Sequence, residues 1–234
     1  MADIAFRSVQ RSVWTSATVS PVATAPSGIV DGDVLLMFVT LPDNAVTFNT
    51  PVAGWSRIGA AVSTGDSTTA LYWKKASSEG ASWTMTSLYG TSTTGGIVVL
   101  AYSNAASVTN WNQTNTSGTN LSGPSITPPI DGCMIVQFAG CDPSDDTQDF
   151  TADTSPAATK RYSETDTGYN YAYIGVQDYL QTTAAAIALD MGTFGTLEAF
   201  GHHQVAITPE ITHRDTNSGT GTTISAPTDT QPGD

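Results

Sequence analysis

Short apolar segments bounded by turn-forming residues recur along the chain, roughly every ten positions, which is the spacing of a β-sandwich or barrel. The run 34–39 lies between the turn signals 31–33 and 41–44, and the run 97–102 follows a Gly-Gly pair. Segment 82–86 alternates polar and apolar residues, as a half-buried strand does. The alanine-rich segment 182–189 is short and has no apolar stripe, so we do not expect a helix there. The pattern predicts an all-β protein.

Two of these runs, 34–39 and 97–102, are apolar throughout instead of alternating. A strand with one face in water should alternate with a period of two residues. Both faces of these strands are therefore expected to be covered. Loops of the same chain and a second subunit are both consistent with this pattern.

The second half of the chain repeats features of the first. Segment 29–38 resembles segment 129–138, and Asp31 and Asp131 are 100 positions apart. Three further similarities follow in the same order, namely 70–73 with 171–174, 96–101 with 203–207, and Trp14 with Trp111. Ordered similarities indicate an internal repeat. We predict two pseudo-repeated halves, 13–108 and 109–208, that close into one jelly-roll-like β-sandwich, with two small sandwiches as the alternative.

Both ends of the chain are expected to extend from this sandwich. Residues 1–12 are predicted to be an N-terminal arm, and 209–234 an extended C-terminal tail dense in Thr, Ser, Gly and Asp. Such a tail cannot bury enough apolar surface to become ordered by itself, which points to a partner. The predicted partner-binding residues of the two arms are Phe6, Arg7, Arg11, Ile211, Arg214 and Ile224.

Charge excludes some functions. With 8 basic and 21 acidic residues the net charge is −13, which repels nucleic-acid phosphates. No run of 18 apolar residues is present, so no membrane span is expected. The first residues do not form a secretory signal, so we expect synthesis in a cytoplasm. Cys133 and Cys141 flank one predicted strand, too far apart for a disulfide, and are expected to be free thiols.

The sequence offers few candidates for metal-binding or catalytic residues. Asp142, Asp145, Asp146 and Asp149 are weak calcium candidates, although their spacing does not match an EF-hand and a solvated loop is the preferred interpretation. Successive side chains on a strand point to opposite faces, so His202 and His203 are not expected to share a metal. Nucleophile-elbow and phosphate-loop motifs are missing from the sequence. We therefore expect no catalytic residue, no cofactor and no enzymatic activity.

The aromatic residues make glycan binding a further hypothesis. Exposed aromatic rings could stack on sugars, whereas buried ones would fill the core or seal subunit contacts, which is the favoured interpretation. The candidates are Trp14, Trp55, Trp83, Trp111, Tyr169, Tyr171 and Tyr173.

A succession of motifs is also informative. A Gly-Asp pair before an apolar run (29–36) leads to a Gly-Trp pair (51–55), a Tyr-Trp-Lys segment (70–76) and a second apolar run ending in Tyr (96–102). The succession resembles a group of β-sandwich structural proteins of tailed bacteriophages. That resemblance covers about residues 25–105 and implies capsid decoration (cement), tail or fibre roles without catalysis.

Together these observations predict a non-enzymatic virion structural protein that decorates the outer surface of a phage capsid. Its expected partners are the major capsid protein, other virion proteins and further copies of itself. An outer position suits the acidic net charge better than a position facing DNA. A tail or fibre component and a carbohydrate-binding module are the alternatives.

Overall fold

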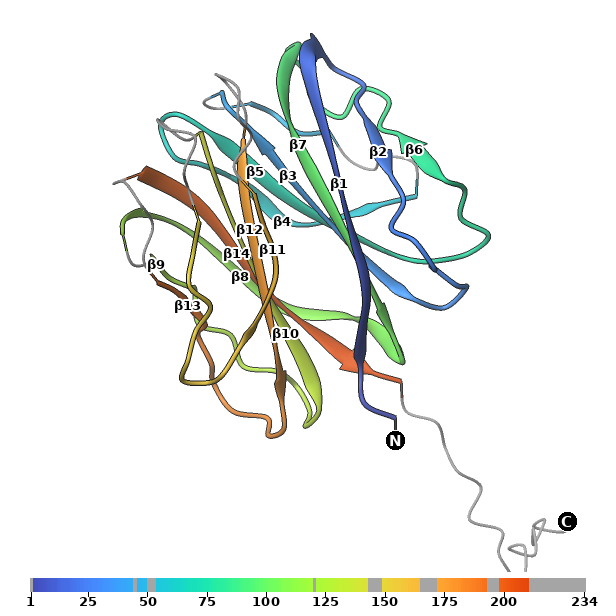
Figure 1. Cartoon of the computed structure of the whole chain (residues 1–234), viewed down its shortest axis with the longest axis vertical. Coiled ribbons are helices and arrows are strands. Elements are labelled where there is room, and N and C mark those ends of the chain that lie inside the picture. Colours follow the sequence, from blue (N-terminus) through green and yellow to red (C-terminus); the bar gives the residue numbers. More distant parts are fainter. Residues whose placement is uncertain are drawn as a thin grey trace, which may run out of the picture.

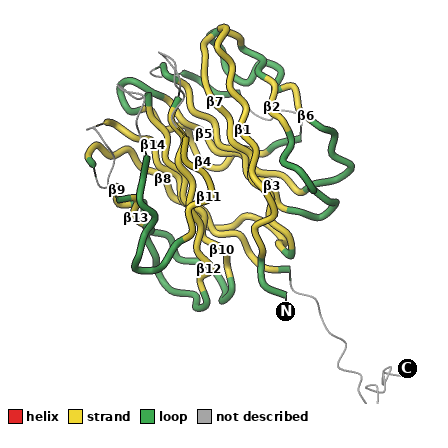
Figure 2. Tube along the Cα trace, viewed as in Figure 1, coloured by secondary structure: helices red, strands yellow, loops and turns green. Residues whose placement is uncertain are grey.

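The computed structural model describes residues 2–43, 46–49, 54–119, 121–142, 149–164, 172–192 and 198–210. Within these ranges the regular structure consists of β-strands, and no helix occurs. Figure 2 shows strands joined by turns and loops throughout the described chain. The all-β prediction is confirmed, and the architecture is a β-sandwich.

Two large antiparallel sheets make up the sandwich (Figure 1). The first contains, in spatial order, β1 (Ala5–Thr18), β7 (Thr93–Ser103), β3 (Val34–Leu41), β5 (Thr68–Lys75) and β4 (Ser56–Ser63). The second contains β11 (Thr159–Glu164), β12 (Tyr173–Gln181), β10 (Cys133–Cys141), β14 (Glu198–Pro209) and β8 (Ala105–Gly118). Each sheet therefore comes from one half of the sequence.

Two small pairs of strands accompany the large sheets. In the first half β2 (Val22–Thr24) pairs with β6 (Ser82–Thr84), and in the second β9 (Leu121–Ser122) pairs with β13 (Asp190–Met191). Numbered within its own half, each strand thus has the same neighbours as its counterpart: the order β1-β7-β3-β5-β4 reappears as β8-β14-β10-β12-β11. The predicted internal repeat is present in the fold.

The register of the pairs shows which residues correspond. Leu36 lies opposite Leu100, and Val136 lies opposite Val205. Since Leu36 and Val136 are equivalent, Leu100 corresponds to Val205, 105 positions later. The strand matches expected from the sequence are correct, but two of them are out of register. These are the match of 96–101 with 203–207 and that of 70–73 with 171–174, since Leu71 lies opposite Phe38 and its equivalent Val176 lies opposite Phe138.

The tryptophan match is also corrected. Trp14 lies opposite Gly95, whereas Trp111 lies opposite Val205. Because Val205 corresponds to Leu100, which lies opposite Val9, Trp111 corresponds to Val9 instead. The two tryptophans lie on equivalent strands at different heights.

The core between the large sheets is built from alternate residues of both halves. These buried side chains include Val34, Leu36, Phe38, Leu71, Val98, Leu100, Val136, Phe138, Ile174, Val176, Val205 and Ile207. The sheets therefore share one core, which favours the single sandwich over two small ones.

The other face of each sheet is covered by the chain itself. Leu35, Met37 and Val39 pack with Trp83 of β6 and with Trp55. In the second half Ile135 packs with Leu189, beside the β9–β13 pair. This explains the runs without alternation and favours coverage by the same chain over coverage by a second subunit.

The repeated Asp-Gly turn has the same hydrogen bonds in both halves. Asp31 Oδ1 accepts from the backbone of Ser78 at 2.6 Å, and Asp131 Oδ1 accepts from Ala184 at 2.7 Å. The glycine that follows each aspartate has positive φ, +91° in Gly32, a conformation that favours glycine. The Asp-Gly similarity therefore marks a structural turn.

The expected N-terminal arm is corrected. Residues 5–12 belong to β1, which pairs with β7 from Ala5 to Thr18. At the other end, β14 extends to Pro209. Residues 211–234, which hold most of the predicted tail, lie outside the described residues.

Candidate functional site

Both ends of the described chain meet at one end of the sandwich. The side-chain amide of Asn104 donates to the Asp3 carbonyl at 3.0 Å, and the Asn104 carbonyl accepts from the Glu210 backbone at 2.9 Å. Asn104 lies in the turn between β7 and β8, with φ of +56°. Figure 1 shows the N-terminus and the end of β14 close together at this end of the sandwich. We call this end the terminal pole.

Arg7 of β1 is bound within its own sheet. Its guanidinium forms two contacts with the buried Asp33 carboxylate, Nε–Oδ2 at 2.6 Å and Nη2–Oδ1 at 3.0 Å. Asp33 also accepts from the Val30 backbone at 3.0 Å. Arg7 therefore fixes β1 to the turn that precedes β3.

Arg11 of β1 joins the two sheets at their β1–β11 rim. It lies 3.1 Å from the Glu164 carboxylate and donates to the Ala172 carbonyl at 3.2 Å. Burial and the Glu164 hydrogen bond raise the pKa of the neighbouring Tyr162. Arg11 contributes to the closure of this rim.

The side chain of Phe6 is partly buried. Its ring packs edge-on against Tyr102, and the Arg161 guanidinium lies 4.4 Å from the ring centre. Like Arg7 and Arg11, Phe6 lies in β1 and contacts other residues of the sandwich, which corrects the expectation that the three project from an arm. The other predicted partner residues, Ile211, Arg214 and Ile224, lie outside the described residues.

The two calcium candidates that the structure describes, Asp142 and Asp149, have different surroundings. Asp149 is paired with Lys160 at 2.8 Å. Burial, and then the charges of Asp66 and Glu198, raise the pKa of Asp142. Asp145 and Asp146 lie outside the described residues. Within the described ranges, no three His, Cys, Asp or Glu side chains are grouped to hold a metal ion.

The adjacent histidines point to opposite faces, as predicted. His203 lies in the central core, where Nε2 is 3.0 Å from the Thr69 hydroxyl. His202 lies on the outer face beside Gln137 and Phe200. Burial lowers the pKa of His202 to about 4 and that of His203 to about 3. Both are neutral structural residues at pH 7.

Buried glutamines were not identified from the sequence. Gln137 and Gln177 are cross-strand neighbours joined by a 2.6 Å hydrogen bond, and Gln204 lies on the other side of Gln137. Gln204 donates to the Ile187 carbonyl and Gln177 to the Asp190 carbonyl, both at 3.0 Å. These amides attach the β9–β13 layer to the sheet.

The Gly-Trp and Tyr-Trp-Lys motifs meet in space. Lys74 Nζ lies 2.7 Å from Glu79 Oε1 and within 6 Å of the ring centres of Trp55 and Trp83. The Trp83 indole donates to Glu79 at 2.7 Å, and the two tryptophan rings pack edge to face. We call these four residues the tryptophan–lysine cluster. It fixes the β2–β6 layer to the first sheet, a structural role for those motifs.

The aromatic candidates divide into buried and exposed. Trp55, Trp83 and Tyr173 are buried, and Trp14 stacks on Tyr89. Trp111 on β8 is 48% exposed. Tyr169 and Tyr171 lie outside the described residues. Of the candidates that the structure describes, Trp111 alone presents a largely exposed ring.

Trp111 lies where the edge strands β4 and β8 approach each other, which we call the β4–β8 rim. A Cβ atom on Gly59 would lie 2.6 Å from the indole, so the ring covers the backbone of β4. Further along, the Asn115 amide donates to the Ser63 carbonyl at 3.2 Å. The rim therefore joins the two sheets through the indole of Trp111 and the amide of Asn115, while Arg57 of β4 donates to the Gly59 carbonyl at 3.1 Å.

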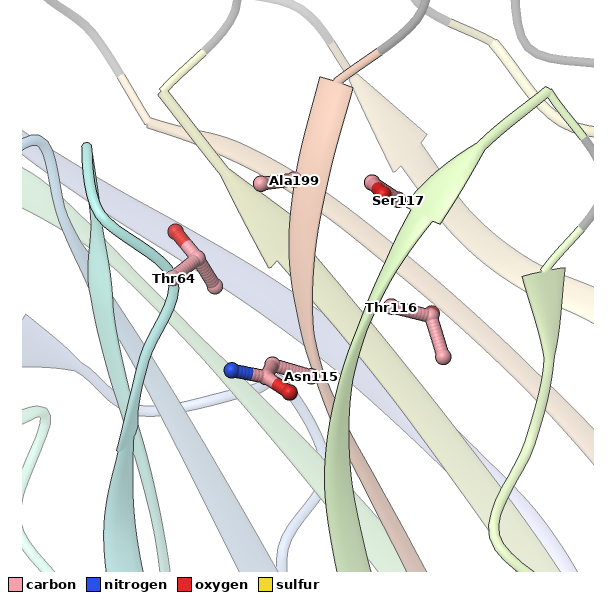
Figure 3. A pocket seen from close by; sticks show the side chains of 5 residues that line it. All are labelled: Thr64, Asn115, Thr116, Ser117 and Ala199. Carbon is pink, nitrogen blue, oxygen red and sulfur yellow. The ribbon is translucent and has the colours of Figure 1, made fainter.

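Two hollows border β8. One, of about 180 Å³, is lined by Thr64, Asn115, Thr116, Ser117 and Ala199 (Figure 3). The other, of about 450 Å³, is lined by Asn110, Trp111, Asn112, Ser125, Ile126 and Thr127. Amides, hydroxyls and one indole suit recognition of an uncharged polar ligand more than acid–base chemistry.

Comparison with known proteins identifies no relative. No family model matches the chain, and neither a curated protein nor a solved structure matches it. In the part of the chain that the structure describes, no helix has the length and hydropathy of a membrane span.

Proposed function

We propose that the chain is a non-enzymatic structural protein of a tailed-phage virion that decorates and stabilises the outer surface of the capsid. The terminal pole carries this proposal. The two described ends lie beside Asn104, where Asp3 and Glu210 are exposed, so one partner surface can contact both ends together. Two linked contacts bind more tightly than either alone, because the second forms at high local concentration.

The phage-like motifs support this function through their structural roles. The Asp-Gly turn and the tryptophan–lysine cluster both hold the sandwich together. A group of proteins that shares such motifs would share a scaffold rather than a reaction. Similarity at these residues is therefore consistent with a particle component.

Charge supports an outer position. The net charge of −13 disfavours contact with packaged DNA and keeps neighbouring copies soluble. Arg7 and Arg11 are paired internally, which leaves the acidic surface uncompensated by them. Contact with the major capsid protein is accordingly proposed through the terminal pole.

Immunogold electron microscopy of particles from a producing culture tests the location. We expect gold over heads. Gold on tails would replace decoration by a tail or fibre role, and intact particles without gold would contradict the virion function.

A truncation tests the mode of attachment. A chain ending at Glu210 keeps every described strand and loses Ile211, Arg214 and Ile224. We expect unchanged thermal unfolding and at least tenfold weaker co-sedimentation with heads. Attachment at full strength would show that the tail is not the anchor.

A further inference from the structure

The β4–β8 rim differs in charge from the rest of the molecule. β8 contains no charged residue in 14 positions, although the chain carries 21 acidic and 8 basic residues. The opposite rim, between β1 and β11, contains Arg11, Lys160, Arg161 and Glu164. Strand β8 thus offers no charge to an ionic ligand, and Arg57 on the facing strand β4 is bonded to the Phe48 and Gly59 carbonyls, so the ligand should itself be neutral.

The indole of Trp111 is held in place from one side. Gly59 has no side chain and has φ of +67°, so the ring lies directly over the β4 backbone. Any other residue at position 59 would collide with Trp111 and with Gln113. The ring nevertheless remains 48% exposed. A rigid, half-exposed indole is a stacking surface with little conformational entropy to lose on binding.

Hydrogen-bonding groups flank the indole on both sides along β8. Toward Ser117, the smaller hollow is lined by Thr64, Asn115 and Ser117 (Figure 3). The Thr64 hydroxyl lies 2.9 Å from the Ser67 hydroxyl, so the amide of Asn115 and the hydroxyl of Ser117 are the polar groups offered to a ligand. The side-chain NH₂ group of Asn115 donates to the Ser63 carbonyl, and the side-chain oxygen of Asn115 can accept a hydrogen bond from a ligand. The larger hollow adds the hydroxyls of Ser125 and Thr127 beside Trp111.

One acceptor in this rim lacks a partner. Gln113 Oε1 is shielded from water next to Gly59, and no hydrogen bond reaches it from the described residues. Unpaired buried acceptors cost free energy. Because this oxygen is packed against Gly59 beside the indole, a sugar hydroxyl reaches it only when the Gln113 side chain turns outward on binding.

We propose that the β4–β8 rim binds a neutral oligosaccharide, with one sugar ring stacked on Trp111 and adjoining hydroxyls bonded to Asn115 and Ser117. The C–H face of a pyranose is apolar and matches the indole, while its rim of hydroxyls matches amides and hydroxyls. From Trp111 to Ser117 the strand extends about 20 Å, which suits several linked sugars. The inference concerns this rim and is independent of attachment at the terminal pole.

The test uses the full chain and an array of neutral and acidic glycans, followed by calorimetric titration with the strongest neutral oligosaccharide. We expect neutral glycans to bind, Trp111→Ala to weaken binding at least tenfold, and Trp111→Phe to lose less. Val22→Ala, at a side chain that is 51% exposed on β2, is the matched control and should bind within twofold of the unmodified chain. Circular dichroism melts verify that each variant is folded.

Ser117→Ala provides a second variant, which removes a hydroxyl of the smaller hollow and leaves the Asn115–Ser63 hydrogen bond in place. It should weaken neutral-glycan binding by severalfold without affecting the fold. Three results would overturn the proposal: no neutral glycan on the array is bound, Trp111→Ala binds as well as the unmodified chain, or Trp111→Ala changes the sedimentation coefficient. The last result would make the rim a contact between copies of the chain.

Discussion

Phe38 and Phe138 occupy equivalent positions in the two halves of the chain and stack on each other, with ring centres 5.2 Å apart and planes 26° apart. Phe38 lies on β3 and Phe138 on β10, the central strands of the two sheets. A residue that contacts its own equivalent lies on a twofold axis. The halves are therefore related by a pseudo-twofold axis that passes between these rings.

Contacts away from the axis occur in reciprocal pairs, as this symmetry requires. Gly96 faces Ile174 of the other half, and the equivalent Gly201 faces Thr69. The register makes Thr69 the counterpart of Ile174. Each half thus packs on the other as two subunits of a symmetric dimer would.

The first prediction concerns close packing at the axis. A Cβ atom at Gly140 would collide with Thr40 and lie 2.9 Å from Phe38 Cε1, so Gly140→Ala should lower the free energy of unfolding by about 1–3 kcal/mol. Gly90 has nothing within 4 Å of such an atom, so Gly90→Ala should change stability by less than about 1 kcal/mol. Urea unfolding checks both, and equal effects would contradict the role of packing.

Local patterns allowed most of the strands to be predicted. The runs 34–39 and 97–102 lie within β3 and β7, and the Asp-Gly turns mark equivalent points in each half. Both cysteines are buried thiols that form no disulfide with each other, as the length of the strand between them indicated. Apolar periodicity and turn residues act over a few positions, so the sequence displays them directly.

The pairing of strands that are far apart in the sequence could be predicted less well. Strand β1 reads as polar and unpatterned because it lies at a sheet edge, so residues 5–12 were assigned to an arm. The offset between equivalent residues is 100 positions for β3 and β10, 102 for β1 and β8, and 105 for β7 and β14, because the connections differ in length. Trp14 and Trp111, which are 97 positions apart, share a residue type and not an equivalent position. The exposure of Trp111 depends on the glycine opposite it, which no local pattern reveals.

The second prediction concerns the tryptophan–lysine cluster. Lys74→Met leaves the Glu79 carboxylate buried, with its side chain 7% exposed and without its counterion, and should cost about 3–5 kcal/mol. The exposed pair of Lys160 and Asp149 is the control, where Lys160→Met should cost no more than about 1 kcal/mol. Chemical denaturation at pH 7 measures both. A similar cost for the two variants would show that the cluster contributes no buried ion pair.

The third prediction separates folding from attachment at β1. Arg7→Met removes two contacts from the buried Asp33, which keeps its bond from Val30, and should destabilise the chain by about 2 kcal/mol. The exposed Gln10→Met on the same strand should be nearly neutral. Below the unfolding temperature the Arg7 variant should bind its partner normally. Weaker attachment with unchanged stability would instead assign Arg7 to the partner surface.

The fourth prediction is a loss of stability in mild acid. Burial holds the pKa of His202 at about 4 and that of His203 at about 3, below the value of about 6.5 in an unfolded chain. Between pH 6.5 and 4 the unfolded state binds protons that the folded state does not, so stability falls as pH falls. Each histidine contributes a slope of up to about 1.4 kcal/mol per pH unit. The double variant His202→Gln, His203→Gln should flatten the pH dependence of unfolding in this range, and an unchanged slope would contradict the assignment.

The last prediction follows from a break in the pseudo-twofold symmetry. Thr40 and Gly140 are equivalent positions, yet the side chain of Thr40 occupies the space that a Cβ atom on Gly140 would need. Two copies of the first half would bring Thr40 against its own equivalent, whereas the two different halves fit. Fragments 1–104 and 105–210, when co-expressed, should therefore form a one-to-one complex, and fragment 1–104 alone should not dimerise.

Thr40→Gly in fragment 1–104 should relieve this collision and permit a homodimer, with Phe38 stacked on its symmetry mate. Light scattering of the purified fragments measures each state. Dimerisation of the unmodified first half would show that Gly140 is not what restricts pairing to unlike halves. If the Thr40→Gly fragment stayed monomeric while the two halves still associated, the selectivity would lie in other contacts across the axis, such as that between Thr69 and His203.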